Sequence, residues 1–472
     1  MAKLSTSSLA LAIALSVSGC SMLEPRLPQA DAGTPVSWPL PASGITASAD
    51  APAAADIGWR DFFADARLEQ VIAQALANNR DLRVALLNVE RAQAQYRIVR
   101  ADRVPGLGVT GQMERIGGDV PTSEQYSVNL GVSAFELDLF GRVRNLSQSA
   151  LQGYLATEQN QRAVQLALVA QVAGSWLALG ADQQSLAIAR DTLATYEESL
   201  ALAQRMFDLG ATSALQLNQT RTLVETARAD VARYTGQVAQ GISALNLLVG
   251  QNVGASLLPT QLDVATSGLS ALPAGMDSKV LLRRPDIMAA EYALRGANAN
   301  IGAARAAFFP SIRLTGGIGS ASGDLSGLFE SGTKVWSFVP QINIPIFQGG
   351  KLRANLGMAT ADRDIALAQY EKAIQNGFRE VSDALVLSQT LATQRQAMED
   401  LVAAAQKAHD LSQARYDAGM DSFLILLDAR RSLYSARQAL VQVQLAEQAN
   451  RVTLYKVLGG GWLENSPAVQ AP

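Results

Sequence analysis

The sequence has very few of the side chains that build metal sites and redox centres. Its 472 residues include one cysteine and one histidine. One cysteine cannot form an intramolecular disulfide, and one histidine without cysteine partners cannot complete a zinc cluster. The formal net charge is only −3 and is spread evenly, so the basic face that nucleic-acid binding requires is missing. The composition argues against metal chemistry and against nucleic acid as a partner.

Long apolar runs and catalytic motifs are also scarce. After the N-terminus no stretch reaches 18 uninterrupted apolar residues, which argues against a transmembrane helix. Apolar residues still make up 48% of the chain, enough for a large core. There is no nucleophile elbow. The one match to G-x-G-x-x-G, Gly106–Gly111, falls inside a predicted strand, where it cannot cradle a dinucleotide. We therefore expect a protein that is not an enzyme.

The N-terminus is typical of an exported protein. Lys3 precedes the short apolar stretch Leu9–Val17, which predicts a signal peptide over residues 1–19. The only cysteine, Cys20, follows small residues, and this arrangement resembles the bacterial lipobox. That resemblance implies a diacylglyceryl and an N-acyl lipid on Cys20 as the only non-protein group, and Ser21 favours export to the outer membrane. The alternative is an ordinary signal peptide with an incidental cysteine. Residues 20–57 are predicted to be a lipidated, extended linker.

The chain repeats itself at a spacing of about 205 to 209 residues. Proline, glycine and aspartate positions match as well as apolar ones, which chance similarity between alanine-rich helices does not explain. The matches include Arg100–Gly111 with Arg305–Gly316, and Phe207–Leu215 with Tyr416–Leu424. We expect two homologous halves, residues 58–262 and 263–461, followed by a tail at 462–472.

Each half begins with a helix and two strands. The helix, near 68–103 or 276–308, ends at a proline, which disfavours its continuation. Two strands with period-two alternation follow. They are predicted at about 105–115, 125–138, 310–320 and 335–347. In the second strand the apolar face is predicted to carry Tyr126, Val128, Leu130, Val132 and Ala134.

A very long helical pattern follows each strand pair. The two long patterns contain no proline and correspond to roughly 100 Å of helix each. A turn then reverses the chain into a second helix that is closed by glycine. The long helices are predicted at about 142–209 and 351–418, and the returning ones at 214–249 and 423–458. Ser213 and Ser422 are candidate N-caps of the returning helices.

The strands indicate an oligomeric membrane barrel. Strands of about ten residues with one apolar face match those of a transmembrane β-barrel. Four strands cannot close a barrel, and an open sheet edge is not tolerated in lipid. Two copies give eight strands and a filled barrel, whereas three give twelve and a wet lumen. Tyr126, Trp336 and Phe338 suit an interfacial aromatic girdle. The alternative, a soluble sheet with one solvated face, leaves the long helices without a compact body.

The duplicated order of helix, strand, strand, long helix and shorter helix resembles the TolC superfamily. Local segments are similar to its lipoprotein branch, the OprM-like outer-membrane factors of RND drug-efflux pumps. They extend over essentially the whole mature chain and include Trp59–Phe63, Asn78–Arg83, Phe135–Arg142, Arg283–Ile287, Ile301–Pro310 and Leu458–Trp462.

The resemblance implies a mainly α fold with a transmembrane β part. It implies a homotrimer in which four strands from each protomer form a 12-stranded barrel among the outer-membrane lipids. The long helices then form a periplasmic α-helical barrel. Such a duct conducts passively, because an inner-membrane RND transporter supplies the energy and a periplasmic adaptor, or membrane fusion protein, links the two.

The resemblance also places a gate at the periplasmic helix turns. The gate residues that it implies are Tyr416, Asp421, Leu424, Asp428 and Arg431. Leu424 and Asp428 are four residues apart and share a helix face. Three copies would give an apolar constriction and an acidic ring suited to a cation-selective pore. We expect Arg431 to hold Asp428 in an ion pair, and Tyr416 to hydrogen-bond a neighbouring helix. Periodicity alone leaves open an ordinary solvated pair.

Three other functions compete with this interpretation. A lipid-anchored periplasmic enzyme would need a site that the motifs do not provide. A static porin or structural lipoprotein would not need such long helices. The exit duct of a type I secretion system or of a metal-efflux system lies within the same superfamily, and the sequence separates these weakly.

Overall fold

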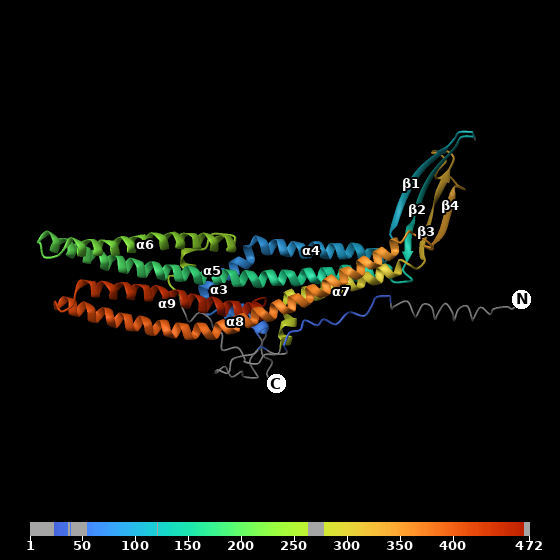
Figure 1. The fold of residues 1–472 in the computed structure, drawn as a ribbon. Coiled ribbons are helices and arrows are strands. Elements are labelled where there is room, and N and C mark those ends of the chain that lie inside the picture. The colour runs from blue at the N-terminus through green and yellow to red at the C-terminus, as the bar shows by residue number, and fades with distance from the viewer. Residues whose placement is uncertain (1–22, 36–37, 39–53, 120, 263–277, 467–472) are drawn as a thin grey trace. The chain divides into compact units, whose positions relative to one another are not determined.

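The computed structural model of the chain describes residues 23–35, 38, 54–119, 121–262 and 278–466 (Figure 1). The predicted signal peptide and Cys20 lie outside these residues. The elements in the first half are η2 (Ala54–Asp56), α2 (Trp59–Phe62), α3 (Ala66–Asn78), α4 (Arg80–Ala101), β1 (Leu107–Ile116), β2 (Ser123–Leu137), α5 (Arg142–Asp208), α6 (Ala214–Val249) and η3 (Ala255–Leu257). Those in the second half are η5 (Ser278–Arg283), α7 (Pro285–Ala306), β3 (Ser311–Ser322), β4 (Lys334–Asn343), α8 (Lys351–Asp417) and α9 (Phe423–Val457).

The chain divides into two compact units, and each takes segments from both halves of the sequence. We call the first the sheet unit; it comprises the described residues within 1–32, 87–159 and 288–373. The second, the helical unit, comprises those within 33–86, 160–287 and 374–472. Each unit is described by its own contacts below.

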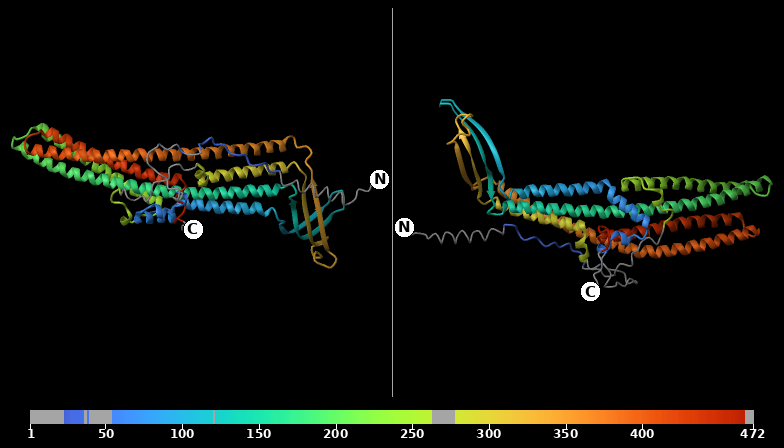
Figure 2. Two further views of the ribbon diagram at one scale, coloured as in Figure 1. Left: turned by 90° about the horizontal axis from the view of Figure 1, so that it is seen from below. Right: turned by 180° about the vertical axis from the view of Figure 1, so that it is seen from behind.

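In the sheet unit the four strands form one antiparallel sheet in the order β1-β2-β3-β4 (Figures 1 and 2). They lie where the period-two alternation predicted strands. Within the described chain β1 and β4 each pair on one side only, so both are edge strands. Their outer N–H and C=O groups are available to another strand.

One face of this sheet is apolar across all four strands. Adjacent rows on this face are Val109, Leu130, Ile318 and Trp336, and then Leu107, Val132, Gly316 and Phe338. Trp336 is 77% exposed and Leu107 72% exposed. Soluble monomers rarely expose so continuous an apolar surface, whereas a lipid-facing sheet must.

The opposite face is polar and rich in glycine. Its rows include Gly108, Gly131, Gly317 and Ser337, and also Glu136, Arg313 and Gln341. A Cβ atom on Gly131 would lie 2.3 Å from the carbonyl oxygen of Gly316, and one on Gly319 would lie 2.1 Å from that of Val128. The strands β2 and β3 therefore approach so closely that these two positions require glycine.

A bulge in β2 was not predicted from the alternation. The register against β3 shifts between Val132 and Phe135, and Ala134 has a left-handed φ of 53°. The Ala134 N–H donates to Thr315 Oγ1 at 3.0 Å. Because the extra residue changes the parity, Phe135 takes the place opposite Leu314 on the apolar face. The predicted placement of Ala134 on that face is therefore wrong.

In the helical unit α6 lies alongside α5, and α9 lies alongside α8 (Figures 1 and 2). One 18-residue window of α5 has a mean hydropathy of 1.5, enough by length and composition to cross a membrane, but half of it is buried inside the protein. The same helix contributes Val169, Val172, Trp176 and Leu179 to the core of this unit. Packing within the chain accounts for the buried half of this window.

The single helix predicted at 68–103 is wrong, because the chain breaks it at Asn79. This residue has an extended backbone, with φ −62° and ψ 132°. Its side-chain oxygen accepts from the Leu82 N–H at 2.8 Å, and its amide donates to the Leu248 carbonyl at 2.8 Å. A capping asparagine that also reaches another helix ends α3 and begins α4 in one step.

The helix predicted at 276–308 is also interrupted. Residues 276–277 lie outside the described chain, and the 3₁₀ helix η5 precedes α7. The helix α7 begins at Pro285, the position at which a helix tolerates proline best. Arg284, just before it, donates to the Val457 carbonyl at 3.0 Å and pairs with Asp286 at 2.7 Å and Glu380 at 2.9 Å. The break is thus held by packing that local periodicity does not encode.

Candidate functional site at the helix turns

Two turns in the helical unit have the same backbone. Gly210 follows α5 with φ 72°, and Gly419 follows α8 with φ 71°. In each turn the glycine N–H and the next N–H bond to carbonyls at the end of the preceding helix. The acceptors are Phe207 at 2.9 Å and Met206 at 2.8 Å in the first turn, and Tyr416 at 2.9 Å and Arg415 at 2.8 Å in the second. Glycine suits both turns because its left-handed φ carries no Cβ clash.

The returning helices start differently. Ser213 caps α6, because its hydroxyl accepts from the Gln216 N–H at 3.2 Å, as predicted. Ser422 occupies the predicted N-cap position of α9, but its hydroxyl makes no cap hydrogen bond. The N–H that it would cap, on Ile425, donates instead to the Ser422 main-chain carbonyl at 3.1 Å.

An ion pair closes the second turn. Arg415 Nε lies 2.6 Å from Asp421 Oδ2, and Arg415 Nη2 lies 2.8 Å from Asp421 Oδ1. The Asp421 side chain is 15% exposed and that of Arg415 is 54% exposed. These two hydrogen bonds stabilise the ionised carboxylate, so they lower the pKa of Asp421. The sequence predicted Asp421 at the site but did not identify Arg415 as its partner.

The predicted pairing of Asp428 with Arg431 is wrong for the single chain. Both side chains are exposed, and neither forms an ion pair or hydrogen bond within the described residues. Arg431 instead shares a face of α9 with Leu424, two turns earlier, and both line a groove of about 530 Å³ against α6. Asp428 is exposed and does not line that groove.

Tyr416 makes the expected hydrogen bond to a neighbouring helix. Its hydroxyl accepts from Gln216 Nε2 of α6 at 3.3 Å. Gln216 Oε1 in turn accepts from the Thr212 hydroxyl at 2.8 Å. The Tyr416 ring lies against Phe423 of α9, with centroids 5.7 Å apart. Tyr416 therefore connects the two turns.

Sequence reasoning missed Arg430. It donates from Nη1 to the Ser199 hydroxyl of α5 at 2.7 Å, and from Nη2 to Gln413 Oε1 of α8 at 2.7 Å. Burial of the guanidinium lowers the pKa of Arg430. One side chain thus ties α9 to two other helices. The repeat could have indicated it, because Arg221 stands at the matching place in the first half.

The sheet and the turns together define a membrane channel subunit. The sheet presents an apolar face to its surroundings and a polar face on the other side, while the helix turns carry a network of polar and charged side chains. The family model named "Outer membrane efflux protein" matches residues 71–251 and 277–460, and the chain belongs to this family.

Relatives and solved structures agree with the family. The antibiotic efflux pump outer membrane protein ArpC of Pseudomonas putida is 48% identical over 97% of this chain and 96% of its own length. The cation efflux system protein CusC of Escherichia coli O157:H7 is 44% identical over 95% of this chain and 97% of its own length. The open-state structure of the Neisseria gonorrhoeae MtrE outer membrane channel aligns with a TM-score of 0.87 at 38% identity, covering 94% of this chain and 99% of that one.

The chain is therefore the outer-membrane channel of an efflux pump, with helices that extend into the periplasm. The predicted mainly α fold with a four-stranded sheet in each chain is confirmed. Proteins of this family are transport conduits rather than enzymes.

Proposed function

We propose that the chain works as a homotrimeric exit duct of a tripartite RND-type multidrug efflux pump. The observation that carries this proposal is the four-stranded sheet with two open edges and a continuous apolar face. Lipid does not tolerate open edges, so β1 of one copy must pair with β4 of another. Two copies make an eight-stranded barrel that side chains fill, and three make a barrel with a lumen.

Substrate choice belongs to the partners of the duct. Relatives named for antibiotic and for cation efflux are almost equally similar to this chain, at 48% and 44% identity. A duct fold that serves both leaves selection to the inner-membrane transporter, with a periplasmic adaptor joining the two. A metal-efflux role is the second candidate, because CusC is among the relatives.

Chemical crosslinking in cells followed by copurification separates the two roles. We expect an RND transporter and its adaptor to be recovered with the chain, and drug accumulation to rise in a strain that lacks it. Recovery of a type I secretion ATPase would overturn the proposal. A strain whose metal tolerance falls while drug accumulation stays unchanged would favour the metal-efflux role.

The second turn is proposed as the periplasmic gate. In a trimer, three copies each of Leu424 and Asp428 form an apolar and an acidic ring, with Tyr416, Asp421 and Arg431 around them. Because Asp428 and Arg431 have no partner in the single described chain, contacts between copies are free to engage them. We expect Asp428→Ala with Arg431→Ala to raise conductance in planar bilayers. Unchanged conductance and open probability would remove these residues from the gate.

Cys20 is proposed to carry the N-terminal lipid. The barrel itself holds the protein in the membrane, so the lipid serves targeting and assembly more than attachment. A Cys20→Ser variant exported by a different signal peptide should therefore retain measurable efflux. Complete loss of efflux by a correctly exported variant would show that the lipid is essential.

A further inference from the structure

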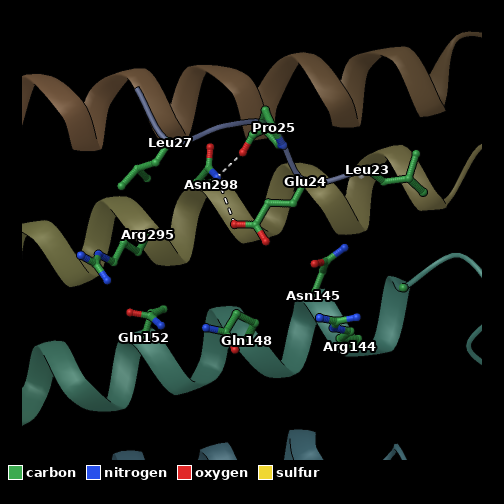
Figure 3. A pocket seen from close by; sticks show the side chains of 11 residues that line it. Leu23, Glu24, Pro25, Leu27, Arg144, Asn145, Gln148, Gln152, Arg295 and Asn298 are labelled. Atoms are coloured by element: carbon green, nitrogen blue, oxygen red, sulfur yellow. Dashed lines mark hydrogen bonds between the residues drawn. The ribbon is translucent and has the colours of Figure 1, made fainter. Parts of the chain in front are cut away.

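A polar cavity in the sheet unit lies between α5, α7 and the N-terminal segment Leu23–Leu27. Its volume is about 610 Å³, within the usual range for small-ligand sites. Figure 3 shows Asn145 and Gln152 standing above α5 toward the segment, and Glu24 pointing back toward α5, with Arg144 and Gln148 also lining the cavity. The proposed gate uses none of these residues.

The N-terminal segment is fastened at this place. Asn298 Nδ2 donates to Glu24 Oε1 at 3.0 Å and to the Pro25 carbonyl at 2.8 Å. Arg305 Nη1 donates to the Leu23 carbonyl at 3.1 Å. Asn298 is only 2% exposed, so its two amide hydrogens are committed inside the protein. This part of the predicted linker is extended, and these hydrogen bonds hold it against α7, where it forms one wall of the cavity.

The cavity wall has hydrogen-bonding capacity that the described protein leaves unused. Gln152 is 7% exposed, and its Oε1 is buried without a partner; the same holds for Oδ1 of Asn298. A buried acceptor without a donor is unfavourable, so such an atom indicates a missing partner. Among the described residues, the second carboxylate oxygen of Glu24 and the guanidinium of Arg144 also lack a protein partner. Arg295, by contrast, is paired with Glu291.

These side chains can bind a ligand that carries both hydrogen-bond donors and an anionic group. The buried Gln152 oxygen needs an N–H or O–H donor, and the exposed Glu24 carboxylate favours a donor that carries a positive charge. Arg144 is also exposed and offers its guanidinium to an anionic oxygen. Water hydrates both exposed charges, but one ligand with an ammonium and an anionic oxygen would pair with both and also supply the donor that Gln152 lacks. We propose that the cavity binds a phosphoethanolamine group, with its primary ammonium on Glu24 and Gln152 and its phosphate on Arg144.

The place of the cavity points to a membrane lipid as the source of this group. Gly141 and Arg144 line one end of the cavity, and β2 ends only four residues before Gly141. Lipid headgroups occupy about 5–8 Å beyond the hydrocarbon core. With the sheet in the outer membrane, Arg144 therefore lies at headgroup depth on the helical side. The inference rests on that placement and does not depend on the pump partner or the gate.

A comparison of two lipids tests the chemistry. Phosphatidylcholine keeps the phosphate but has no N–H donor, so it is a matched control for phosphatidylethanolamine. The full-length protein is reconstituted in nanodiscs with equal amounts of both lipids and then analysed by native mass spectrometry for retained lipid. We expect about ten-fold preference for phosphatidylethanolamine, the effect of two additional hydrogen bonds. Retention in the bulk ratio would overturn the proposal.

Three variants assign the groups. Gln152→Met and Glu24→Gln should remove the preference, whereas Arg144→Gln should weaken retention of both lipids, because both carry phosphate. Gln95→Met and Arg97→Gln, at exposed positions of α4, are the matched controls and should change nothing. If the three cavity variants retain lipid like the wild type, the proposed site is wrong.

Two further measurements distinguish a membrane lipid from a soluble ligand, and a binding role of the cavity residues from a structural one. Soluble glycerophosphoethanolamine should not displace the lipid at millimolar concentration; displacement would overturn the lipid as the source of the group. Conductance is recorded on the same preparations. Loss of lipid preference with normal conductance then concerns the cavity alone, whereas loss of both would show that the variant damages the channel and that the cavity residues are structural.

Discussion

The two helix turns share a backbone and differ in their side chains. The glycines Gly210 and Gly419 have φ values that agree within a degree, and the same carbonyl positions accept their hydrogen bonds. Where the second turn has Arg415, Asp421, Asp428 and Arg431, the matching residues of the first are Met206, Thr212, Gln219 and Thr222. The backbone of the turn is common to both halves, whereas these four charged positions are uncharged in the first half. This difference is consistent with the proposal that the second turn is the gate.

The largest expected effect tests the shared backbone. Gly210→Ala and Gly419→Ala should each destabilise their turn by about 1–2 kcal/mol, because a Cβ at left-handed φ is strained. Neither site has an atom within 4 Å of the new Cβ, so the strain is the only contribution. Hydrogen exchange of the flanking amides measures it. Gly153→Ala, inside α5 with equally open space, is the control and should stabilise slightly. Clearly unequal losses of stability at the two turns would show that their backbones are not equivalent.

The next effect separates the two helix starts. Ser213→Ala removes a side-chain cap and should destabilise the first turn of α6 by about 1 kcal/mol. Ser422→Ala removes no cap bond and should stay within about 0.5 kcal/mol. Amide exchange at the start of α6 and of α9 reports both. Equal losses would mean that the Ser422 hydroxyl caps α9 in solution.

A smaller effect concerns the charge that only the second turn carries. Arg415→Met installs the first-half residue and breaks the pair with Asp421. Because this pair lies at the surface with one partner exposed, its contribution is small, and we expect the open probability in planar bilayers to rise by about two- to five-fold. The reciprocal change, Met206→Arg, meets no carboxylate at the matching place, Thr212, and should leave gating unchanged. A response of equal size to both variants would refute the asymmetry.

The smallest effect is a pH dependence confined to acid. The pair lowers the pKa of Asp421 below its ordinary value of 3.8, so the folded turn favours the ionised carboxylate. Its contribution is complete above that ordinary value and is lost as the pH falls through the lowered one. Open probability should therefore stay flat from pH 7 to about pH 5, and change through this pair only below 3.8. A step near pH 6 that disappears in Arg415→Met would contradict this sign.

Periodicity and the repeat predicted much of the fold. Alternation located the four strands, and the absence of proline predicted the lengths of α5 and α8 within a residue. What failed depends on contacts between distant segments. Asn79 ends a helix because Leu248 is nearby to accept its amide, and Ala134 leaves the alternation because Thr315 faces it. Neither partner is visible in a local pattern.

For the candidate site too, some features were predicted from the sequence and others were not. The turns were predicted because glycines and repeat matches mark them, and the Tyr416 hydrogen bond was predicted from the family resemblance. The pairing was not, because a helix offers several partners at similar spacing. Asp421 pairs with Arg415 across the turn, whereas Asp428 leaves Arg431 unpaired in the single chain. Arg430 was missed because its partners, Ser199 and Gln413, lie on two other helices.

The open edges of the sheet also set the order of events during biogenesis. A single described chain carries unpaired backbone groups on β1 and β4. In lipid these groups are energetically unfavourable, and in water they can pair with strands of other chains. The protomer can therefore neither insert into the bilayer alone nor persist as a folded monomer in water without a risk of aggregation. Edge pairing and membrane entry must be coupled, so that the rate of meeting other protomers competes with the rate of aggregation. In the proposed trimer, the supply of newly exported chains would itself help to determine whether the channel forms.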